Sequence, residues 1–190
     1  MAEVPSTRIL PLESRAPEFE LPDAEGNLMA LDDVRGPQGL LVMFVCNHCP
    51  YVIHLASALA KFANELEKQG VGVVAINSND AVKYPADSPE KMVEFAQKYG
   101  WDFPYLVDED QSIAKAYVAA CTPDFYLFDG ELTLVYAGQF DSSRPKNGEP
   151  ITGEDLRAAV EALVDGEDPL EDQLPSTGCS IKWKPGNEPV

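Results

Sequence analysis

The fold is decided by one stretch of the chain, Gly39-Leu40-Leu41-Val42-Met43-Phe44-Val45-Cys46-Asn47-His48-Cys49-Pro50. It opens with a continuous apolar run that has the length and β-branched character of a strand buried on both faces. After Pro50, apolar residues recur at steps of three and four until Gly70, which predicts an amphipathic helix. A second apolar run, residues 71–76, follows. The region therefore predicts a right-handed βαβ unit that feeds a parallel sheet.

The rest of the chain adds further α/β elements around this unit. The pattern predicts a helix over about 89–99, a strand near 103–107, a short helix after Asp110, an antiparallel hairpin over 124–137 and a last helix that ends near 165. We divide the chain into an N-terminal extension (1–14), one α/β domain (15–165) and an acidic, proline-bearing C-terminal tail (166–190).

Composition excludes several classes of partner. The 190 residues include 32 acidic and 14 basic side chains, for a formal charge of −18, which would repel nucleic acid and anionic membrane surfaces. The first thirty residues carry prolines and acids without the apolar segment of a secretory signal. No apolar run approaches the ~18 residues of a membrane helix. We therefore expect a cytoplasmic protein that binds neither nucleic acid nor membrane.

Cys46 and Cys49 form a C-x-x-C pair between the predicted strand and helix. Such a pair is either half of a metal site or a redox-active dithiol. A structural zinc site needs four ligands, and the remaining cysteines and histidines lack paired spacing. With Cys46 near the N-cap of the helix, the helix dipole and free N–H groups would stabilise a thiolate. The position therefore favours the dithiol, which can close into a disulfide bond.

Two stretches resemble a known family. Cys46-Asn47-His48-Cys49-Pro50-Tyr51-Val52 and Thr122-Pro123-Asp124-Phe125 are similar to the thioredoxin superfamily, and Ala16-Pro17-Glu18-Phe19 resembles the start of alkyl hydroperoxide reductase and thiol-specific antioxidant proteins, that is, peroxiredoxin-like proteins. The resemblance implies a thioredoxin-like α/β fold, with a central mixed sheet flanked by helices. It also implies a thiol-disulfide oxidoreductase with no bound cofactor, which acts on protein or small-molecule disulfides and is recycled by an external thiol reductant.

The resemblance also suggests roles for individual residues. Cys46 would attack the partner disulfide and Cys49 would resolve the mixed disulfide. His48 would stabilise the thiolate and make the potential more oxidising, although an exposed histidine without this role is the alternative. Thr122 and Pro123 would contact substrate, with a cis peptide bond between them, because in this fold a cis-proline lies against the dithiol.

The chain departs from peroxiredoxins at positions that handle peroxide. Aligned on Cys49, their pattern Pro-x-x-x-Thr/Ser-x-x-Cys meets Val42 in place of the proline and Cys46 in place of the hydroxyl. Their later arginine is missing before the strand at 124, and the buried acid of thioredoxin is replaced by Leu40. The alternative function is an antioxidant thiol peroxidase that reduces peroxides, with Cys49 peroxidatic and Cys46 resolving.

Two other cysteines and one other function stay open. Cys121 is either a small buried apolar residue or a thiol that reaches the dithiol. Cys179, on the tail, is either inert or an additional redox thiol. A metal-binding or copper-delivery module is the third reading, since soft thiolates suit copper(I). The C-x-x-C spacing and the lack of any histidine after His54 count against it.

Overall fold

A computed structural model describes residues 3–6 and 10–189 of the chain. Its strands are β1 (Glu3–Pro5), β2 (Glu20–Pro22), β3 (Leu28–Ala30), β4 (Gly39–Phe44), β5 (Val71–Asn77), β6 (Tyr105–Val107), β7 (Cys121–Thr122), β8 (Asp124–Asp129), β9 (Leu134–Gly138) and β10 (Thr177–Ser180). Its helices are α1 (Leu31–Val34), α2 (Pro50–Lys68), η1 (Pro85–Asp87, a 3-10 turn), α3 (Pro89–Tyr99), α4 (Ser112–Ala116) and α5 (Glu154–Asp165).

The central sheet has five strands in the order β6-β5-β4-β8-β9. β4 pairs in parallel with β5, which confirms the predicted βαβ unit, and β8 runs antiparallel to β4 and to β9, which confirms the hairpin. The mixed sheet with helices on both faces is the expected thioredoxin-like fold.

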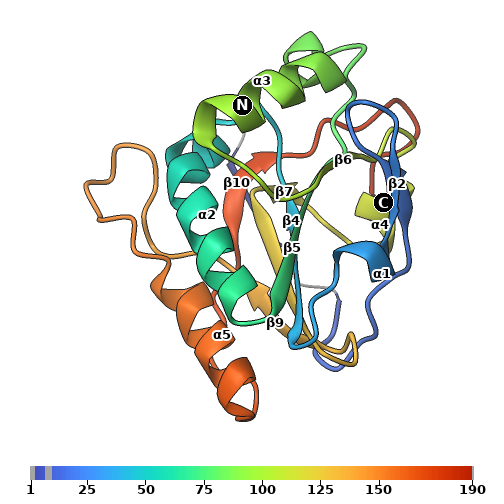
Figure 1. Cartoon of the computed structure of the whole chain (residues 1–190). Helices are drawn as coiled ribbons and strands as arrows, with labels where there is room; N and C mark the ends of the chain where they lie inside the picture. The colour runs from blue at the N-terminus through green and yellow to red at the C-terminus, as the bar shows by residue number, and fades with distance from the viewer. Residues whose placement is uncertain (1–2, 7–9, 190) are drawn as a thin grey trace.

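Two apolar cores lie on the two faces of this sheet. Along β4, Leu41 and Met43 belong to the core that α2, α3 and α5 cover. Leu40, Val42 and Phe44 belong to the other core, against α1 and α4. This alternation follows from the two-residue period of a strand. Because β4 contributes to both cores, the connection that follows it is anchored at the centre of the molecule (Figure 1).

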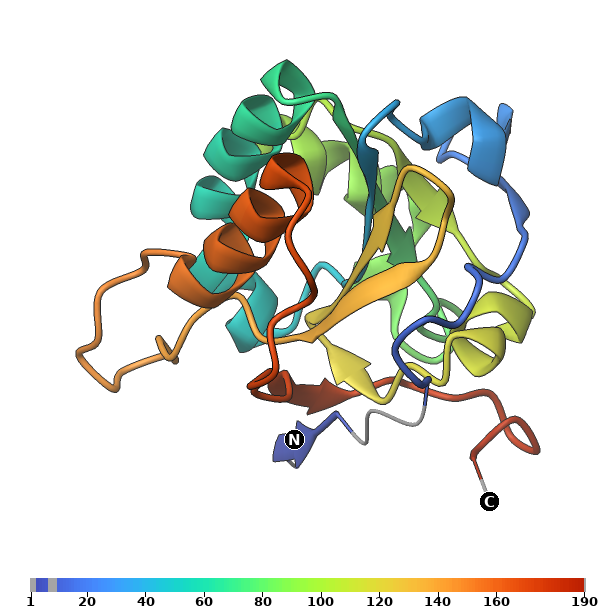
Figure 2. The same cartoon turned by 90° about the horizontal axis from the view of Figure 1, so that it is seen from below.

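Both terminal segments join a second, smaller sheet. Its order is β1-β10-β7, so strand β10 of the C-terminal tail lies between the N-terminal strand and the short strand that precedes β8. Figure 2 shows β1 and β10 together along the lower edge of the molecule. Among the described residues, no helix is long and apolar enough to span a membrane. Cytoplasmic location stays a prediction.

Candidate functional site

The two cysteines of the C-x-x-C pair lie where β4 gives way to α2. Cys46 follows the last residue of β4 by two positions, and Cys49 is the N-cap of α2 with Pro50 as its first helical residue. We expected Cys46 near the N-cap. The helix begins three residues later because proline favours the first helical position, where its missing N–H costs no hydrogen bond. Both thiols are buried, with 1% and 0% of the residue exposed.

Thr122 and Pro123 lie against both sulfurs. The peptide bond between them is cis, as the resemblance predicted. The thiol of Cys49 donates to the carbonyl oxygen of Thr122 at 3.1 Å, and the Sγ atom of Cys46 lies 3.5 Å from the hydroxyl of the same residue. The structure thus brings together four of the predicted site residues, although Cys46 and Thr122 are 76 positions apart in the chain.

The two thiols have unequal acidity. Hydrogen bonding from the Cys46 thiol lowers the pKa of Cys49, and the Cys179 thiol, Thr122 and the backbone at Val52 act in the same direction against the effect of burial. The same interaction with Cys49 raises the pKa of Cys46, as do burial and the negative charge of Asp87. Cys49 is therefore the more acidic thiol of the pair, and the N-terminus of α2 also favours negative charge there. The resemblance assigns the attack on a partner disulfide to Cys46, and that role stays a prediction.

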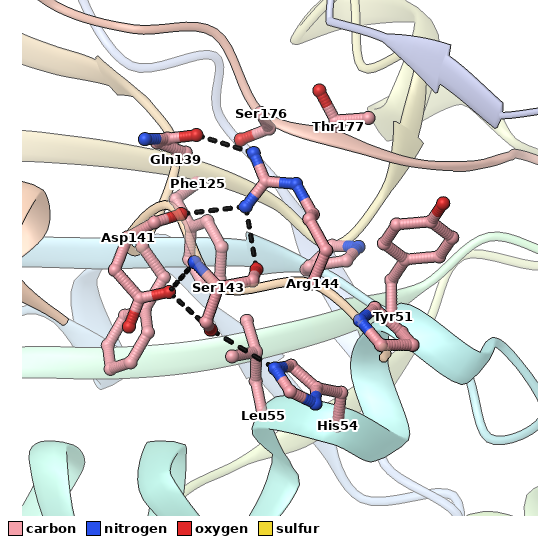
Figure 3. Close-up of a pocket in the computed structure, with 13 residues that line it drawn as sticks. Tyr51, His54, Leu55, Phe125, Gln139, Asp141, Ser143, Arg144, Ser176 and Thr177 are labelled. Carbon is pink, nitrogen blue, oxygen red and sulfur yellow. Dashed lines mark hydrogen bonds between the residues drawn. The ribbon is translucent and has the colours of Figure 1, made fainter. Parts of the chain in front are cut away.

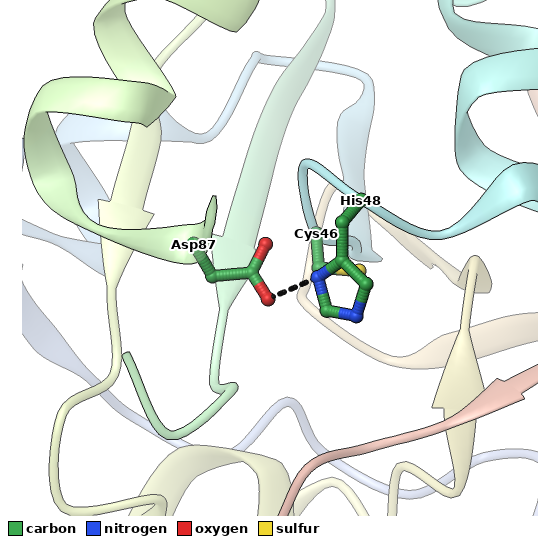
Figure 4. Close-up of side chains that lie close together, drawn as sticks. All are labelled: Cys46, His48 and Asp87. Carbon is green, nitrogen blue, oxygen red and sulfur yellow. Dashed lines mark ion pairs between the residues drawn. The ribbon is translucent and has the colours of Figure 1, made fainter. Parts of the chain in front are cut away.

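His48 forms an ion pair with a carboxylate that sequence reasoning did not identify. Its Nδ1 atom lies 2.7 Å from Oδ2 of Asp87, which is 2% exposed (Figure 4). The contact with Asp87 raises the pKa of His48, although burial opposes it. The ring also stacks on Tyr84, with a centroid distance of 5.8 Å and an interplanar angle of 4°. An imidazolium is therefore favoured beside the dithiol, as the tuning role requires.

Asp87 also fixes the connection that carries the cysteines. Its carboxylate accepts hydrogen bonds from the backbone N–H of Asn47 at 2.8 Å and from the side chain of Asn79 at 2.9 Å. Asn47 in turn accepts a hydrogen bond from the hydroxyl of Tyr105 at 2.8 Å. No local pattern marks Asp87, which precedes the N-cap of α3 by one residue and reaches the site only through the tertiary fold.

One group of potential metal ligands occurs in the described part of the chain. Ligand atoms of Cys46, His48 and Asp87 all lie within 4.8 Å of one another (Figure 4). Three donors of mixed type are fewer than the four of a structural zinc site, so solvent would have to complete the coordination of any ion. Because the carboxylate already pairs with the imidazole, the arrangement also has a complete explanation as a charge network around the dithiol.

The remaining cysteines flank Thr122 on the small sheet. Cys179 of β10 pairs in register with Thr122, and Cys121 pairs with Ser180. Both are buried, and burial raises the pKa of Cys179 to about 12 and that of Cys121 well above its ordinary value. The Cys121 thiol donates to the carbonyl oxygen of Pro123 at 3.6 Å. Both cysteines therefore lie near the site, but the thiol of Cys121 contacts a backbone carbonyl oxygen whereas that of Cys179 contacts Cys49.

A small pocket adjoins the cis-proline on the side of α2. Figure 3 shows Tyr51, His54 and Arg144 around it, and Pro123 also contributes to its wall. His54 shares a 3.1 Å hydrogen bond with Ser143, and the guanidinium of Arg144 donates to backbone carbonyl oxygens of its own loop. These groups stabilise the loop that follows β9. Neither cysteine of the dithiol lines the pocket.

Comparison with known proteins is consistent with this geometry. A crystal structure of an uncharacterized conserved protein from Geobacillus kaustophilus is 53% identical, covers 98% of each chain and superposes with a TM-score of 0.94. The thiol-disulfide oxidoreductase ResA of Halalkalibacterium halodurans is 29% identical over 65% of this chain and 67% of its own length. Peroxiredoxin Bcp of Escherichia coli is 32% identical over 54% of this chain and 60% of its own length.

The family model described as the AhpC/TSA family matches residues 12–137. This segment contains the central strand β4, both cysteines of the C-x-x-C pair and the cis-proline. It ends before α5 and β10, so the match does not include the strand that carries Cys179. Because the matched segment makes up more than half of the chain, the protein belongs to the AhpC/TSA family.

Proposed function

We propose that this protein is a thiol-disulfide oxidoreductase in which Cys46 and Cys49 cycle between dithiol and disulfide. One observation carries the proposal. The two thiols lie together at the start of α2 and both contact Thr122, the residue before a cis-proline. The fold, the AhpC/TSA family and the similarity to a protein named thiol-disulfide oxidoreductase support the same chemistry.

The contacts suggest how the pair divides the reaction. Cys46 attacks one sulfur of a partner disulfide while the adjacent thiolate of Cys49 accepts its proton, and the partner's other sulfur leaves as a thiolate. That thiolate then takes the proton back from Cys49. The regenerated Cys49 thiolate attacks the sulfur of Cys46 in the mixed disulfide, which closes the Cys46–Cys49 disulfide and releases the partner's remaining sulfur as a thiolate that solvent protonates. An external thiol reductant restores the dithiol.

Three neighbouring residues support this cycle in our proposal. His48, held protonated by Asp87, stabilises negative charge on the pair and so favours its reduced form. The hydroxyl of Thr122, 3.5 Å from Cys46, can hydrogen-bond the attacking sulfur. Pro123 fixes the backbone that positions this hydroxyl and the carbonyl group beside Cys49. The substrates would be protein or small-molecule disulfides, and the exchange uses only these sulfur atoms, without a bound cofactor.

A thiol peroxidase is the second candidate, because the lowered pKa of Cys49 is what a peroxidatic cysteine requires. In that reaction the Cys49 thiolate attacks a peroxide and becomes a sulfenic acid, and the departing alkoxide or hydroxide takes up a proton. Cys46 then attacks this sulfur, which releases water and forms the same disulfide. The similarity to peroxiredoxin Bcp favours this reading. The peroxide-handling hydroxyl and arginine of peroxiredoxins, which this sequence lacks, disfavour it.

Trapping experiments separate the two reactions. Cys46→Ser and Cys49→Ser are each treated with a model disulfide and with hydrogen peroxide, and the adducts are identified by mass spectrometry. The oxidoreductase proposal predicts that Cys49→Ser accumulates a mixed disulfide on Cys46 and that peroxide reacts slowly with either variant. Rapid formation of a sulfenic acid on Cys49 in Cys46→Ser would instead establish the peroxidase. Cys121→Ser is the matched control, because this cysteine is equally buried but its thiol contacts only a backbone carbonyl.

A further inference from the structure

Strand β10 lies directly over the backbone next to the dithiol. It runs antiparallel to β7, and this register sets Cys179 opposite Thr122. Thr122 is also the residue whose carbonyl oxygen lies 3.1 Å from the sulfur of Cys49. One residue of the chain thus connects the N-cap of α2 with the C-terminal strand.

The approach of the two strands is unusually close at Gly178. A Cβ atom at this position would lie 2.0 Å from the carbonyl oxygen of Thr122, so only glycine lets β10 sit this near. Cys179 is 4% exposed and belongs to the same apolar core as Cys46 and Cys49. Within that core, the thiol of Cys179 is hydrogen-bonded to Cys49 on the α2 side of the sheet.

We infer that Cys179 is a third redox thiol of this site, which exchanges with the Cys46–Cys49 disulfide to form a disulfide between Cys49 and Cys179. The inference rests on the proposed function, because that cycle supplies the first disulfide. It assigns to the C-terminal strand a chemical role in addition to its structural one.

The exchange needs no reagent from outside the chain. Cys179, as a thiolate, attacks the sulfur of Cys49. The bond between Cys46 and Cys49 breaks, Cys46 leaves as a thiolate, and it takes up the proton that Cys179 gave up. One disulfide is broken and one is formed, so the oxidation state of the protein does not change. Burial raises the pKa of Cys179 to about 12. Because only the thiolate attacks, the exchange accelerates as the pH rises.

Cys121 is an internal comparison for this assignment. It lies on the adjacent strand and is as deeply buried as the dithiol, yet its thiol donates to the carbonyl oxygen of Pro123 at 3.6 Å. It is excluded from the core cluster that contains the other three cysteines. Proximity in the fold therefore favours Cys179 over Cys121 as the partner of Cys49.

Disulfide mapping of Cys46→Ser tests the inference. Trypsin would release Cys49 in peptide 36–61, Cys121 in peptide 116–146 and Cys179 in peptide 158–182, because the bond between Arg144 and Pro145 resists cleavage. After oxidation with diamide and alkylation of free thiols, we expect peptide 36–61 linked to 158–182 at about tenfold or more above its link to 116–146. The link should persist in Cys46→Ser/Cys121→Ser and vanish in Cys46→Ser/Cys179→Ser.

Other products would overturn the inference. These are unlinked peptides, a dominant link from 36–61 to 116–146, or a disulfide between two copies of the chain on a non-reducing gel. Should the variant fail to fold by circular dichroism, the same mapping on oxidised wild-type protein replaces it, with tandem fragmentation to locate the bond; finding only the disulfide internal to 36–61 there would also overturn the inference.

The result separates this inference from the proposed function. If wild-type protein forms the disulfide internal to peptide 36–61 but the variant forms no link to 158–182, Cys179 is not a redox thiol and the proposed function stands. If the variant forms that link but wild-type protein never forms the internal disulfide, the proposed function fails, and with it the exchange on which the inference rests.

Discussion

Two regions of the molecule bring cysteines to Thr122, and they are held in different ways. Residues 46–49 connect the central strand β4 to α2, so the two main cores fix them. Cys179 lies on β10, which pairs with the short strands β1 and β7 at the edge of the molecule (Figure 2). The comparison suggests that the first region carries the chemistry on a rigid support, while the second covers it and can be displaced at lower cost.

The largest expected effect comes from the rigid region. Cys46→Ser or Cys49→Ser should reduce turnover of a model disulfide on the order of 10³-fold or more, because each removes a sulfur that must form a covalent bond. Cys121→Ser should keep wild-type turnover. Steady-state assays with an external dithiol reductant measure all three. Wild-type rates in Cys49→Ser would show that the two cysteines do not work as a pair.

The next effect concerns Asp124, a buried residue at the start of β8, just after strand β7 of the small sheet. Burial raises the pKa of this carboxyl to about 6, although Ala120, Ser6 and Tyr126 donate hydrogen bonds to it. The folded state therefore binds the proton more tightly than the unfolded chain. This contribution to stability is complete below the ordinary pKa of 3.8 and is lost as the pH rises through about 6.

Asp124→Asn should remove that pH dependence. Urea unfolding gives the free energy of unfolding at about pH 4 and at about pH 8. Between these two values the wild-type protein should lose about 2 kcal/mol more of this free energy than the variant loses. Wild type should lose stability relative to the variant as the pH rises. Parallel curves for the two proteins would mean that the carboxyl does not titrate with the raised pKa.

Gly178→Ala tests whether β10 covers the thiols. The added methyl group would overlap the carbonyl oxygen of Thr122, so β10 must shift, at a cost of about 1–3 kcal/mol. We expect the buried thiols to react faster with an aromatic disulfide reagent in the folded protein. Ser180→Ala, on the same strand, should leave the reaction rate unchanged. An unchanged rate in Gly178→Ala would show that access to the dithiol does not depend on β10.

The smallest expected effect lies in the connection between the two cysteines. His48→Ala removes the positive charge that Asp87 maintains beside the dithiol, so the reduced form loses stabilisation. The reduction potential should fall by about 30 mV, equivalent to a tenfold change in the exchange equilibrium. His54→Ala, whose ring contacts Ser143 instead, is the matched control. Equal potentials for His48→Ala and wild type would remove the tuning role.

Local patterns allowed most of the rigid region to be predicted. The apolar run of β4, the helical period after Pro50 and the proline that follows Thr122 each reflect neighbouring residues, and the fold and the cis bond were confirmed. The N-cap was misplaced because a proline at the first helical position determines where α2 begins. The roles of the two cysteines in the reaction stay a prediction.

Two other parts of the site depend on long-range contacts that no short pattern reveals. Asp87 reaches the site from a 3-10 turn about forty residues after the cysteines, and Cys179 reaches it through strand pairing with Thr122. The sequence analysis described the tail only as acidic and proline-bearing, because its strand of four residues has weak local character. Long-range pairing therefore determined what sequence reasoning left open.

The most direct test of the central claim is a redox titration of the wild-type protein. The protein is equilibrated in glutathione buffers of graded potential, free thiols are alkylated, and peptide 36–61 is weighed by mass spectrometry. We predict a single two-electron transition in which Cys49 loses its alkylation site, through a disulfide with Cys46 or, after exchange, with Cys179, while Cys121 in peptide 116–146 stays alkylated throughout. If Cys46 and Cys49 remain alkylated at every potential, the dithiol is not redox-active and the proposed function is wrong.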